Sequence, residues 1–295
     1  MANILVQHGV SNITDQLDLK RRCSQPFANG GFGSIYQGEL QDGRLVAIKH
    51  IDLRSRGELG PGGKRCKHAA HEMYTWSKCE HRGVLKAHGF ALSEEEILLV
   101  SPLMQNGSLT NHLMCSNTGD RLRFCIDLVS AVEYLHAQGI VHGDIKADNV
   151  LVSDSREVQL VDFGNATLVQ YLSLLFTRTS PQFACSIRFT APEIMDGSNK
   201  KNTTQSDVYA LGMTILQILT GQLPYAGEPD FPALAKIFRG VPPPRSHLDG
   251  ILRNQYAEDK LWDLLLRCWT HEPNLRPTMT QVKQVLVEVE QESSP

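Results

Sequence analysis

The chain has 295 residues, a length that predicts two lobes or domains more readily than a single core. Hydrophobic residues make up 41% of it and charged residues 21%, and the net charge is −3, so the composition indicates an ordinary globular protein without a nucleic-acid partner. No run of about 18 apolar residues is present, so we expect no membrane insertion.

Residues 1–22 are polar apart from a short apolar patch at 4–6, and we expect them to form an extension ahead of the first lobe. They lack the basic stretch and apolar core of a signal peptide, and Ala2 excludes N-myristoylation, which requires glycine there. The seven cysteines are scattered without CxxC pairs, so we expect reduced thiols in a cytoplasmic protein.

The predicted elements change in kind along the chain. Residues 25–100 read as strands with one helix: 44–51 and 97–100 are β-rich, and 64–79 have helical spacing after the glycine-rich connector 57–63. Beyond residue 101 the pattern is mainly helical, with helices expected over 120–138, 207–219, 260–269 and 280–290. We expect Gly139 and Gly221 to end the first two of these helices. This order predicts two lobes of α+β type.

A glycine cluster, ANGGFGSIYQG, lies between two strand-like runs near the start of the first lobe. Gly30, Gly31 and Gly33 would let the backbone approach phosphate oxygens that side chains would obstruct. The same pattern also fits an ordinary hairpin turn, so the cluster alone leaves both interpretations open.

Lys49 lies in the apolar strand segment VAIK, and Glu72 lies near the centre of the helix predicted next. A Lys–Glu pair would keep the ammonium charged and direct it at phosphates. The alternative is that the two are unrelated surface charges.

The segment IVHGDIKADNVLV places Asp144, Lys146 and Asn149 within six residues, and Asp162 follows in LVDFG. A carboxylate at position 144 can accept a hydroxyl proton, and the nearby ammonium can stabilise a transferring phosphoryl group. Oxygens of Asn149 and Asp162 are ligands that suit Mg²⁺.

The order of glycine-rich loop, VAIK, helix glutamate, HGDIKADN, DFG and APE resembles the signature set of protein kinases, and it spans nearly the whole chain. The resemblance extends to DVYALG at 207–212 and to Arg276, which is expected to pair with Glu193 of APE. It implies the bilobal α+β protein-kinase fold: an extension over 1–22, then a kinase domain over 23–291, with its N-lobe at 23–101, hinge at 102–104 and C-lobe at 105–291. It also implies an enzyme of intracellular signalling that uses Mg²⁺ and transfers the γ-phosphoryl group of ATP to serine or threonine hydroxyls of protein substrates.

Residue by residue, the resemblance assigns three sets of roles. Catalytic roles fall to Asp144, Lys146, Lys49, Glu72 and Ser186, and Mg²⁺ binding falls to Asn149 and Asp162. Nucleotide contacts fall to Ala28, Gly30, Gly31, Gly33, Ile35, Ala47, Lys49, Met104 and Leu151. The small Ser101 stands at the gatekeeper position, where we expect room behind the adenine, and a column of side chains is expected from Trp76, Ala87, His142 and Phe163.

Lys146 in KADN is typical of serine/threonine kinases, whereas NGSL, LLRCW and RPTM resemble the tyrosine-kinase-like group, which has the same hydroxyl specificity. The chain departs from the family pattern at Ala28, Gly143, Cys185 and Ser186. None of these changes removes a group needed for phosphoryl transfer.

Gly143 replaces the arginine that in the family attracts an activation-loop phosphate. We therefore expect activity that does not depend strongly on phosphorylation of the loop hydroxyls of Thr177, Thr179 and Ser180. If the expectation fails, Arg188 is the candidate to receive the phosphate.

Three other functions fit parts of the pattern. A pseudokinase scaffold would predict loss of Lys49, Asp144, Asn149 or Asp162, and all four are present. A small-molecule phosphotransferase shares the HGD loop but lacks APE and DVYALG. A tyrosine kinase is opposed by Lys146.

Overall fold

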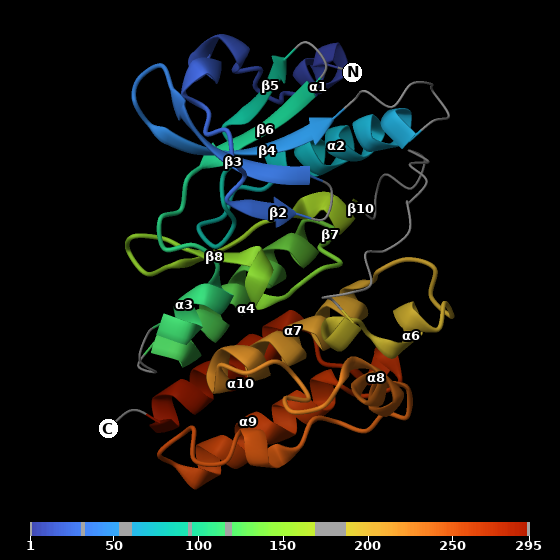
Figure 1. Ribbon diagram of the computed structural model, residues 1–295. Helices are drawn as coiled ribbons and strands as arrows, with labels where there is room; N and C mark the ends of the chain where they lie inside the picture. The colour runs from blue at the N-terminus through green and yellow to red at the C-terminus, as the bar shows by residue number, and fades with distance from the viewer. Residues whose placement is uncertain are drawn as a thin grey trace. The chain divides into compact units, whose positions relative to one another are not determined.

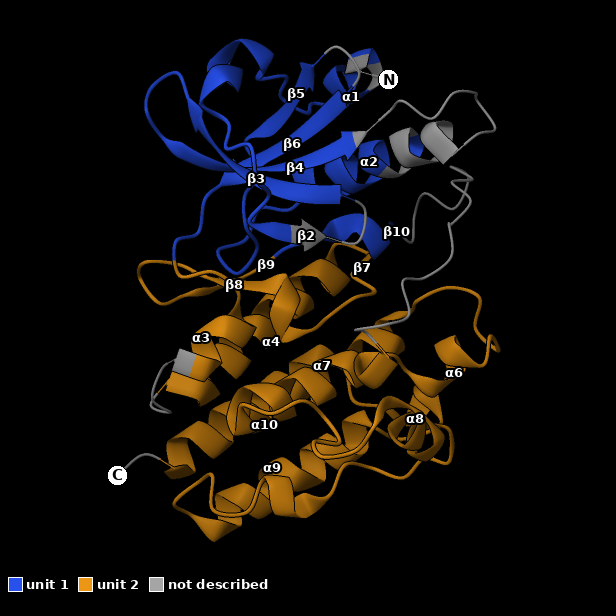
Figure 2. Cartoon of the chain, viewed as in Figure 1, with its two compact units in different colours: residues 1–105, 161–181 blue, residues 106–160, 182–295 orange. Residues whose placement is uncertain are grey.

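The computed structural model describes residues 2–30, 33–52, 61–93, 96–115, 120–168 and 187–293. The chain divides into two compact units, coloured separately in Figure 2. Unit 1 comprises residues 1–105 and 161–181, and unit 2 comprises residues 106–160 and 182–295. Unit 1 is built on a sheet and unit 2 is mainly helical, so the predicted α+β organisation is confirmed.

The sheet of unit 1 has strand order β1-β3-β4-β6-β5, with β2 paired to β3, and its pairs are antiparallel. Its strands are β1 (Leu17–Asp18), β2 (Ala28–Gly30), β3 (Gly33–Leu40), β4 (Leu45–Asp52), β5 (Gly89–Ser93) and β6 (Glu96–Pro102). In the centre, Lys49 of β4 lies opposite Leu99 of β6. Because side chains alternate along a strand, Ile48 and Lys49 point to opposite faces of the sheet.

Helix α2 (Pro61–Ser77) corresponds to the helix predicted over 64–79, but it begins at Pro61, inside the predicted connector, because proline suits the first position of a helix. It buries Ala69, Met73 and Trp76 at spacings of four and three. The short helix η5 (Phe163–Asn165) and β10 (Thr167–Leu168) also belong to unit 1, although the sequence placed them in the C-lobe. The reason is packing: the buried Phe163 ring stacks on Trp76 with 6.3 Å between centroids. Two members of the predicted column therefore meet, and the places of Ala87 and His142 stay a prediction.

Residues 1–22, expected as an extension, contribute to the core of unit 1. They form α1 (Ala2–Gln7), η1 (Thr14–Gln16), β1 and η2 (Leu19–Arg21). Leu5, Val10, Ile13 and Leu17 are buried, and the last two join a cluster with residues of β3, β4, β5 and β6. Leu5 lies in α1, Leu17 lies in β1, and Val10 and Ile13 lie between α1 and η1, so the four belong to no single regular element, which explains why the sequence pattern missed them.

Unit 2 is organised around α7 (Thr204–Thr220), which is buried from Ser206 to Leu219 as its apolar sequence predicts. Its other helices are α3 (Leu109–Cys115), α4 (Arg121–Ala137), α6 (Pro192–Met195), α8 (Asp230–Phe238), α9 (Gln255–Cys268) and α10 (Met279–Ser293). Short strands β7 (Ile140–Val141), β8 (Val150–Val152) and β9 (Val158–Leu160) flank the loops that carry the candidate site. Figure 1 shows α7 and α10 among the helices below β8 and α4.

The four helices predicted after residue 101 are confirmed with shifted ends. Helix α9 begins five residues before the predicted start at Lys260, because the Asn254 side chain accepts a hydrogen bond from the Tyr256 amide and caps the helix there. Gly139 and Gly221 follow α4 and α7 as expected. Helix α8 was not predicted, since its short segment DFPALAKIF carries a proline inside the first turn.

A substitution at Gly89, at the start of β5, tests how closely the N-terminal residues pack against this strand. Its φ is +146°, and a Cβ there would lie 2.2 Å from the Ser11 carbonyl oxygen. We expect Gly89→Ala to lower the thermal midpoint more than Gly43→Ala, whose φ of +88° carries backbone strain of about 1–2 kcal/mol without a close neighbour. Equal midpoint shifts, measured by differential scanning calorimetry, would contradict the close contact between Gly89 and Ser11.

Candidate active site

Lys49 on β4 and Glu72 on α2 form the ion pair that the sequence suggested. Lys49 Nζ lies 2.6 Å from Glu72 Oε1 and 2.9 Å from Asp162 Oδ1. The Glu72 side chain is only 1% exposed and that of Asp162 is 20% exposed. The reading of Lys49 and Glu72 as unrelated surface charges is therefore wrong.

Burial and the neighbouring charges both shift the pKa values of Lys49 and Glu72. Burial alone would lower the pKa of Lys49, but the negative charges of Asp162 and Glu72 raise that pKa above its usual range. Burial raises the pKa of Glu72; the charge of Asp162 adds to this rise and that of Lys49 opposes it. Lys49 therefore stays charged between two carboxyl groups, of which that of Asp162 is the more exposed.

Asp162 has a left-handed backbone conformation with φ 65° and ψ 73°. Such a conformation costs a non-glycine residue energy and is common at functional sites. Its Oδ1 also accepts a bond of 3.4 Å from the Gly164 amide. Lys49 and the Gly164 amide thus both hold Oδ1 of this side chain.

The glycine cluster lies on the paired strands β2 and β3, with Gly30 opposite Gly33. A Cβ at Gly33 would lie 2.0 Å from the His50 carbonyl oxygen, so this glycine is required by strand packing whatever else it does. The hairpin and phosphate-binding interpretations are therefore compatible.

In unit 2, Asp144 lies between β7 and η4 (Ala147–Asn149) and receives two side-chain donors. Lys146 Nζ lies 2.9 Å and 3.1 Å from its two carboxylate oxygens. Asn149 Nδ2 donates to the Asp144 carbonyl at 2.8 Å and to Oδ2 at 2.9 Å, which orients the amide oxygen away from that carboxylate. The three residues that the sequence grouped thus form one hydrogen-bonded set.

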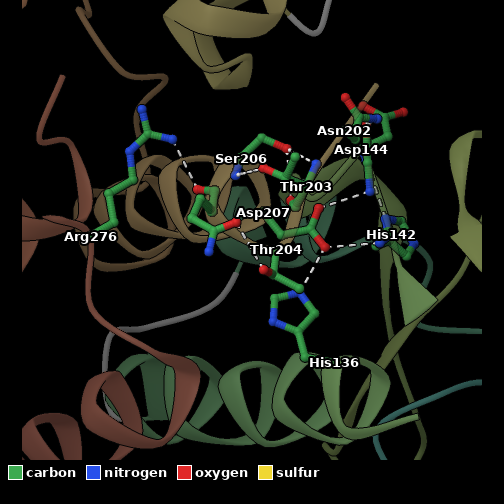
Figure 3. Close-up of polar contacts among 11 residues, drawn as sticks. His136, His142, Asp144, Asn202, Thr203, Thr204, Ser206, Asp207 and Arg276 are labelled. Atoms are coloured by element: carbon green, nitrogen blue, oxygen red, sulfur yellow. Dashed lines mark hydrogen bonds and ion pairs between the residues drawn. The ribbon is translucent and has the colours of Figure 1, made fainter. Parts of the chain in front are cut away.

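The backbone around Asp144 is held by α7. Asp207, 1% exposed, accepts the His142 amide at 2.9 Å on Oδ2 and the Gly143 amide at 2.8 Å on Oδ1 (Figure 3). Two turns later on the same helix, Thr214 donates from Oγ1 to the Ile145 carbonyl at 3.2 Å. A buried helix therefore fixes the loop on both sides of Asp144.

Two residues around this loop were missed by the sequence analysis. His136 Nε2, on α4, pairs with Asp207 Oδ2 at 2.9 Å, and Asn202 Nδ2 donates to the Gly143 carbonyl at 3.0 Å (Figure 3). Gly143 itself has a φ of 77°, where a glycine is favoured. The sequence signal for Asp207 was the DVYALG motif, whereas no motif pointed to His136 or Asn202.

The expected buried pair between Glu193 and Arg276 is present. Arg276 Nη1 and Nη2 donate to the two Glu193 oxygens at 2.6 Å and 2.8 Å, and the Arg276 side chain is fully buried. This bidentate pair joins α6 to the segment before α10, so removal of either partner would leave a buried charge.

Arg188, the candidate phosphate receiver, is already occupied. Its guanidinium donates to the carbonyls of Pro224, Tyr225 and Glu228 at 2.8, 2.9 and 2.6 Å and to the carboxylate of Asp230 at 2.9 Å. Its side chain is 12% exposed. These contacts attach η7 (Ile187–Phe189) to the loop before α8.

The other predicted site residues lie on defined elements. Ala28, Gly30, Ile35, Ala47 and Met104 lie in or just after strands of unit 1, and Leu151 lies on β8 of unit 2. Gatekeeper Ser101 is buried on β6. Gly31, Cys185, Ser186 and the loop hydroxyls at 177, 179 and 180 lie outside the described residues.

Asp207→Asn tests whether α7 fixes the loop around Asp144. An amide offers one oxygen in place of two, so its NH₂ group would face the amide N–H of His142 or Gly143. We expect a loss of about 1–3 kcal/mol in the free energy of unfolding, measured by urea titration. His136→Ala removes one donor and leaves both backbone bonds, so its loss should be smaller; an Asn variant as stable as the wild type would contradict the assignment.

Comparison with known proteins agrees with the geometry. An LRR receptor-like serine/threonine-protein kinase of Arabidopsis thaliana is 31% identical over 93% of this chain, which spans 24% of that relative. A calmodulin-binding receptor-like cytoplasmic kinase of the same plant is 34% identical over 66% of this chain and 42% of the relative. A mitogen-activated protein kinase kinase kinase of Physcomitrium patens is 29% identical over 85% and 31%.

The chain thus spans less than half the length of these three relatives. Among the helices of the described residues, none is long and apolar enough to cross a membrane. The sequence pattern of the protein kinase domain matches residues 24–286, which include every part of the site described above. The chain belongs to the protein kinase family.

Proposed function

We propose that this chain is a protein serine/threonine kinase of the tyrosine-kinase-like group that uses ATP and Mg²⁺. The observation that carries the proposal is the hydrogen-bonded set of Asp144, Lys146 and Asn149 in a chain of the protein kinase family. A scaffold that had lost catalysis would have no need to keep these donors and acceptors together. Names of relatives that include serine/threonine-protein kinase support the hydroxyl specificity.

Asp144 is the proposed acceptor of the substrate hydroxyl proton. Lys146, 2.9 Å from its carboxylate, keeps a positive charge beside the reacting oxygen. Lys146 is also the residue typical of serine/threonine kinases at this position, which supports that hydroxyl specificity. Together the two residues orient the nucleophile and stabilise charge as the phosphoryl group leaves ATP.

The donor chemistry fits Mg²⁺. Asp162 offers a carboxylate that is 20% exposed, and the hydrogen bonds of Asn149 Nδ2 leave its amide oxygen for another partner. Mg²⁺ is commonly bound by one or two protein oxygen ligands together with substrate phosphates. When bound, the ion would neutralise phosphate charge, and Asp162 and Asn149 would hold it.

Lys49 is the proposed ligand of the ATP phosphates. Its partners keep it charged and its position fixed, so little side-chain entropy remains to be lost when phosphate binds. The backbone of Gly30, Gly31 and Gly33 and the side chains of Ala28, Ile35, Ala47 and Leu151 are proposed to surround the nucleotide, with the Met104 amide at the adenine.

A cytoplasmic location with a role in signalling completes the proposal. Four cysteines within the described residues, Cys23, Cys79, Cys125 and Cys268, are free thiols. Free thiols are expected in a reducing compartment.

Two isosteric variants separate the roles of the acidic residues. Asp144→Asn should lower kcat by about 10²–10⁴-fold, because it removes the positioned base, and should leave Mg-ATP affinity nearly unchanged. Asp162→Asn should lower both kcat and Mg-ATP affinity. Phosphoamino-acid analysis of a mixed protein substrate should show phosphoserine and phosphothreonine. Wild-type rates and nucleotide affinities in both variants would exclude the proposed roles.

Activity should not require phosphorylation of the activation loop. Gly143 offers no cation to a loop phosphate, and Arg188 is engaged by carbonyl oxygens and Asp230. A protein with Thr177→Ala, Thr179→Ala and Ser180→Ala and phosphatase-treated wild type should therefore both have initial rates within about threefold of untreated wild type, a difference below about 1 kcal/mol of barrier. A hundredfold loss in either sample would mean that a phosphate is needed.

A further inference from the structure

The N-terminal segment, residues 2–18, contains an internally fixed helix end. The Val10 amide donates to the Leu5 carbonyl at 3.0 Å and the Gly9 amide to the Val6 carbonyl at 2.9 Å, with Gly9 at φ 84°. This is the Schellman arrangement, in which the residues equivalent to Leu5 and Val10 form an apolar contact. Both are only 3% exposed, so the segment has its own anchor in the core of unit 1.

The N-terminal segment then docks along β5. The Phe90 amide donates to the Ser11 carbonyl at 3.0 Å, the Ile13 amide donates to the Phe90 carbonyl at 2.9 Å, and Asn12 forms a parallel bridge with Phe90. The Leu92 amide donates to the Thr14 hydroxyl at 3.0 Å. These bonds satisfy backbone groups on the edge strand of the sheet.

At its other end, the N-terminal segment reaches the opposite edge of the same sheet. Leu17 pairs with Leu40 of β3, and the Gln41 amide donates to the Gln16 carbonyl at 2.8 Å. Ile13 and Leu17 cluster with Ile48, on the sheet face opposite to Lys49. The segment thus crosses the sheet and is held at both edges, which fixes its position.

From this fixed position the N-terminal segment contacts the end of α2. The rings of His8 and Tyr74 meet edge to face with 5.2 Å between centroids. Lys78 Nζ donates to the His8 carbonyl at 3.1 Å and lies over the Tyr74 ring at 5.1 Å. Tyr74 and Lys78 follow Glu72 by two and six residues, so the contact holds the part of α2 that carries the Lys49 partner.

We propose that the N-terminal segment positions α2 so that Glu72 remains on Lys49, which makes residues 2–18 part of the machinery for phosphoryl transfer. This proposal depends on the proposed kinase function at one point: the Lys49–Glu72 pair is taken to serve ATP binding. A shift of α2 would leave Lys49 and Glu72 as uncompensated buried charges, and the segment opposes that shift at the helix end. Leu5 and Val10 are positioning residues that act through His8, Tyr74 and Lys78.

The test compares Leu5→Ala with Val6→Ala, the same kind of change at a neighbour that is 51% exposed. Amide hydrogen exchange is followed in α2 and, as an internal reference, in α7, while Mg-ATP affinity and kcat are measured on the same samples. Leu5→Ala should accelerate exchange in the last two turns of α2 by about tenfold, leave α7 unchanged and weaken Mg-ATP binding, because a buried side chain is truncated. Leu5→Met, which fills a similar volume, should have the exchange rate in α2 and the Mg-ATP affinity of the wild type.

A second pair of variants avoids the core. Lys78→Met removes the donor to the His8 carbonyl and should accelerate exchange in α2 about threefold, whereas Lys78→Arg keeps a donor and should not. The proposal is overturned if Leu5→Ala and Lys78→Met change exchange only within residues 2–18, or if Leu5→Ala accelerates α7 as much as α2 while Lys78→Met changes nothing. If the variants show faster exchange in α2 but the wild-type protein has no kinase activity, the positioning role is kept and the kinase function is rejected.

Discussion

The hydrogen bonds to the buried carboxylate of Asp207 are the interactions on which the loop around Asp144 in unit 2 depends. Asp207 sits on α7, which is buried along nearly its whole length, and it accepts backbone N–H groups from His142 and Gly143. A buried carboxylate is costly unless its oxygens are hydrogen-bonded. The two loop amides supply these hydrogen bonds, and the buried helix in turn fixes the position of the loop. The position of the Asp144 carboxylate follows from this reciprocal arrangement.

In unit 1, the position of α2 is restricted by the buried ion pairs of Lys49. Lys49 is held by Glu72 and Asp162, and separation of the three would leave charges without partners. Such a group favours a single arrangement more than it adds stability, because desolvation offsets much of the attraction. The N-terminal segment adds ordinary apolar burial and backbone hydrogen bonds, which do not carry that desolvation cost.

Much of the site was predictable because its residues occur in short segments with distinct chemistry. The Lys49–Glu72 pair and the Asp144 set were suggested by their motifs, and the buried Arg276–Glu193 pair was implied by the resemblance to protein kinases. His136 and Asn202 could not be predicted, since neither lies in a motif: His136 acts through Asp207, and Asn202 reaches the Gly143 carbonyl from a segment 59 residues away. The role of residues 1–22 was missed because Leu5, Val10, Ile13 and Leu17 are divided between a short helix, a two-residue strand and the turn between them, so their burial marks no single element in the sequence.

The glycine at position 143 links the geometry of the loop to its regulation. Asp207 fixes its amide, Asn202 binds its carbonyl, and φ lies at 77°. A residue with a Cβ would pay about 1–2 kcal/mol for that conformation. Glycine therefore lowers the energy of the loop shape that presents Asp144. Under the proposed function it also offers no cation to a loop phosphate, so both effects favour a loop that keeps its shape without phosphorylation.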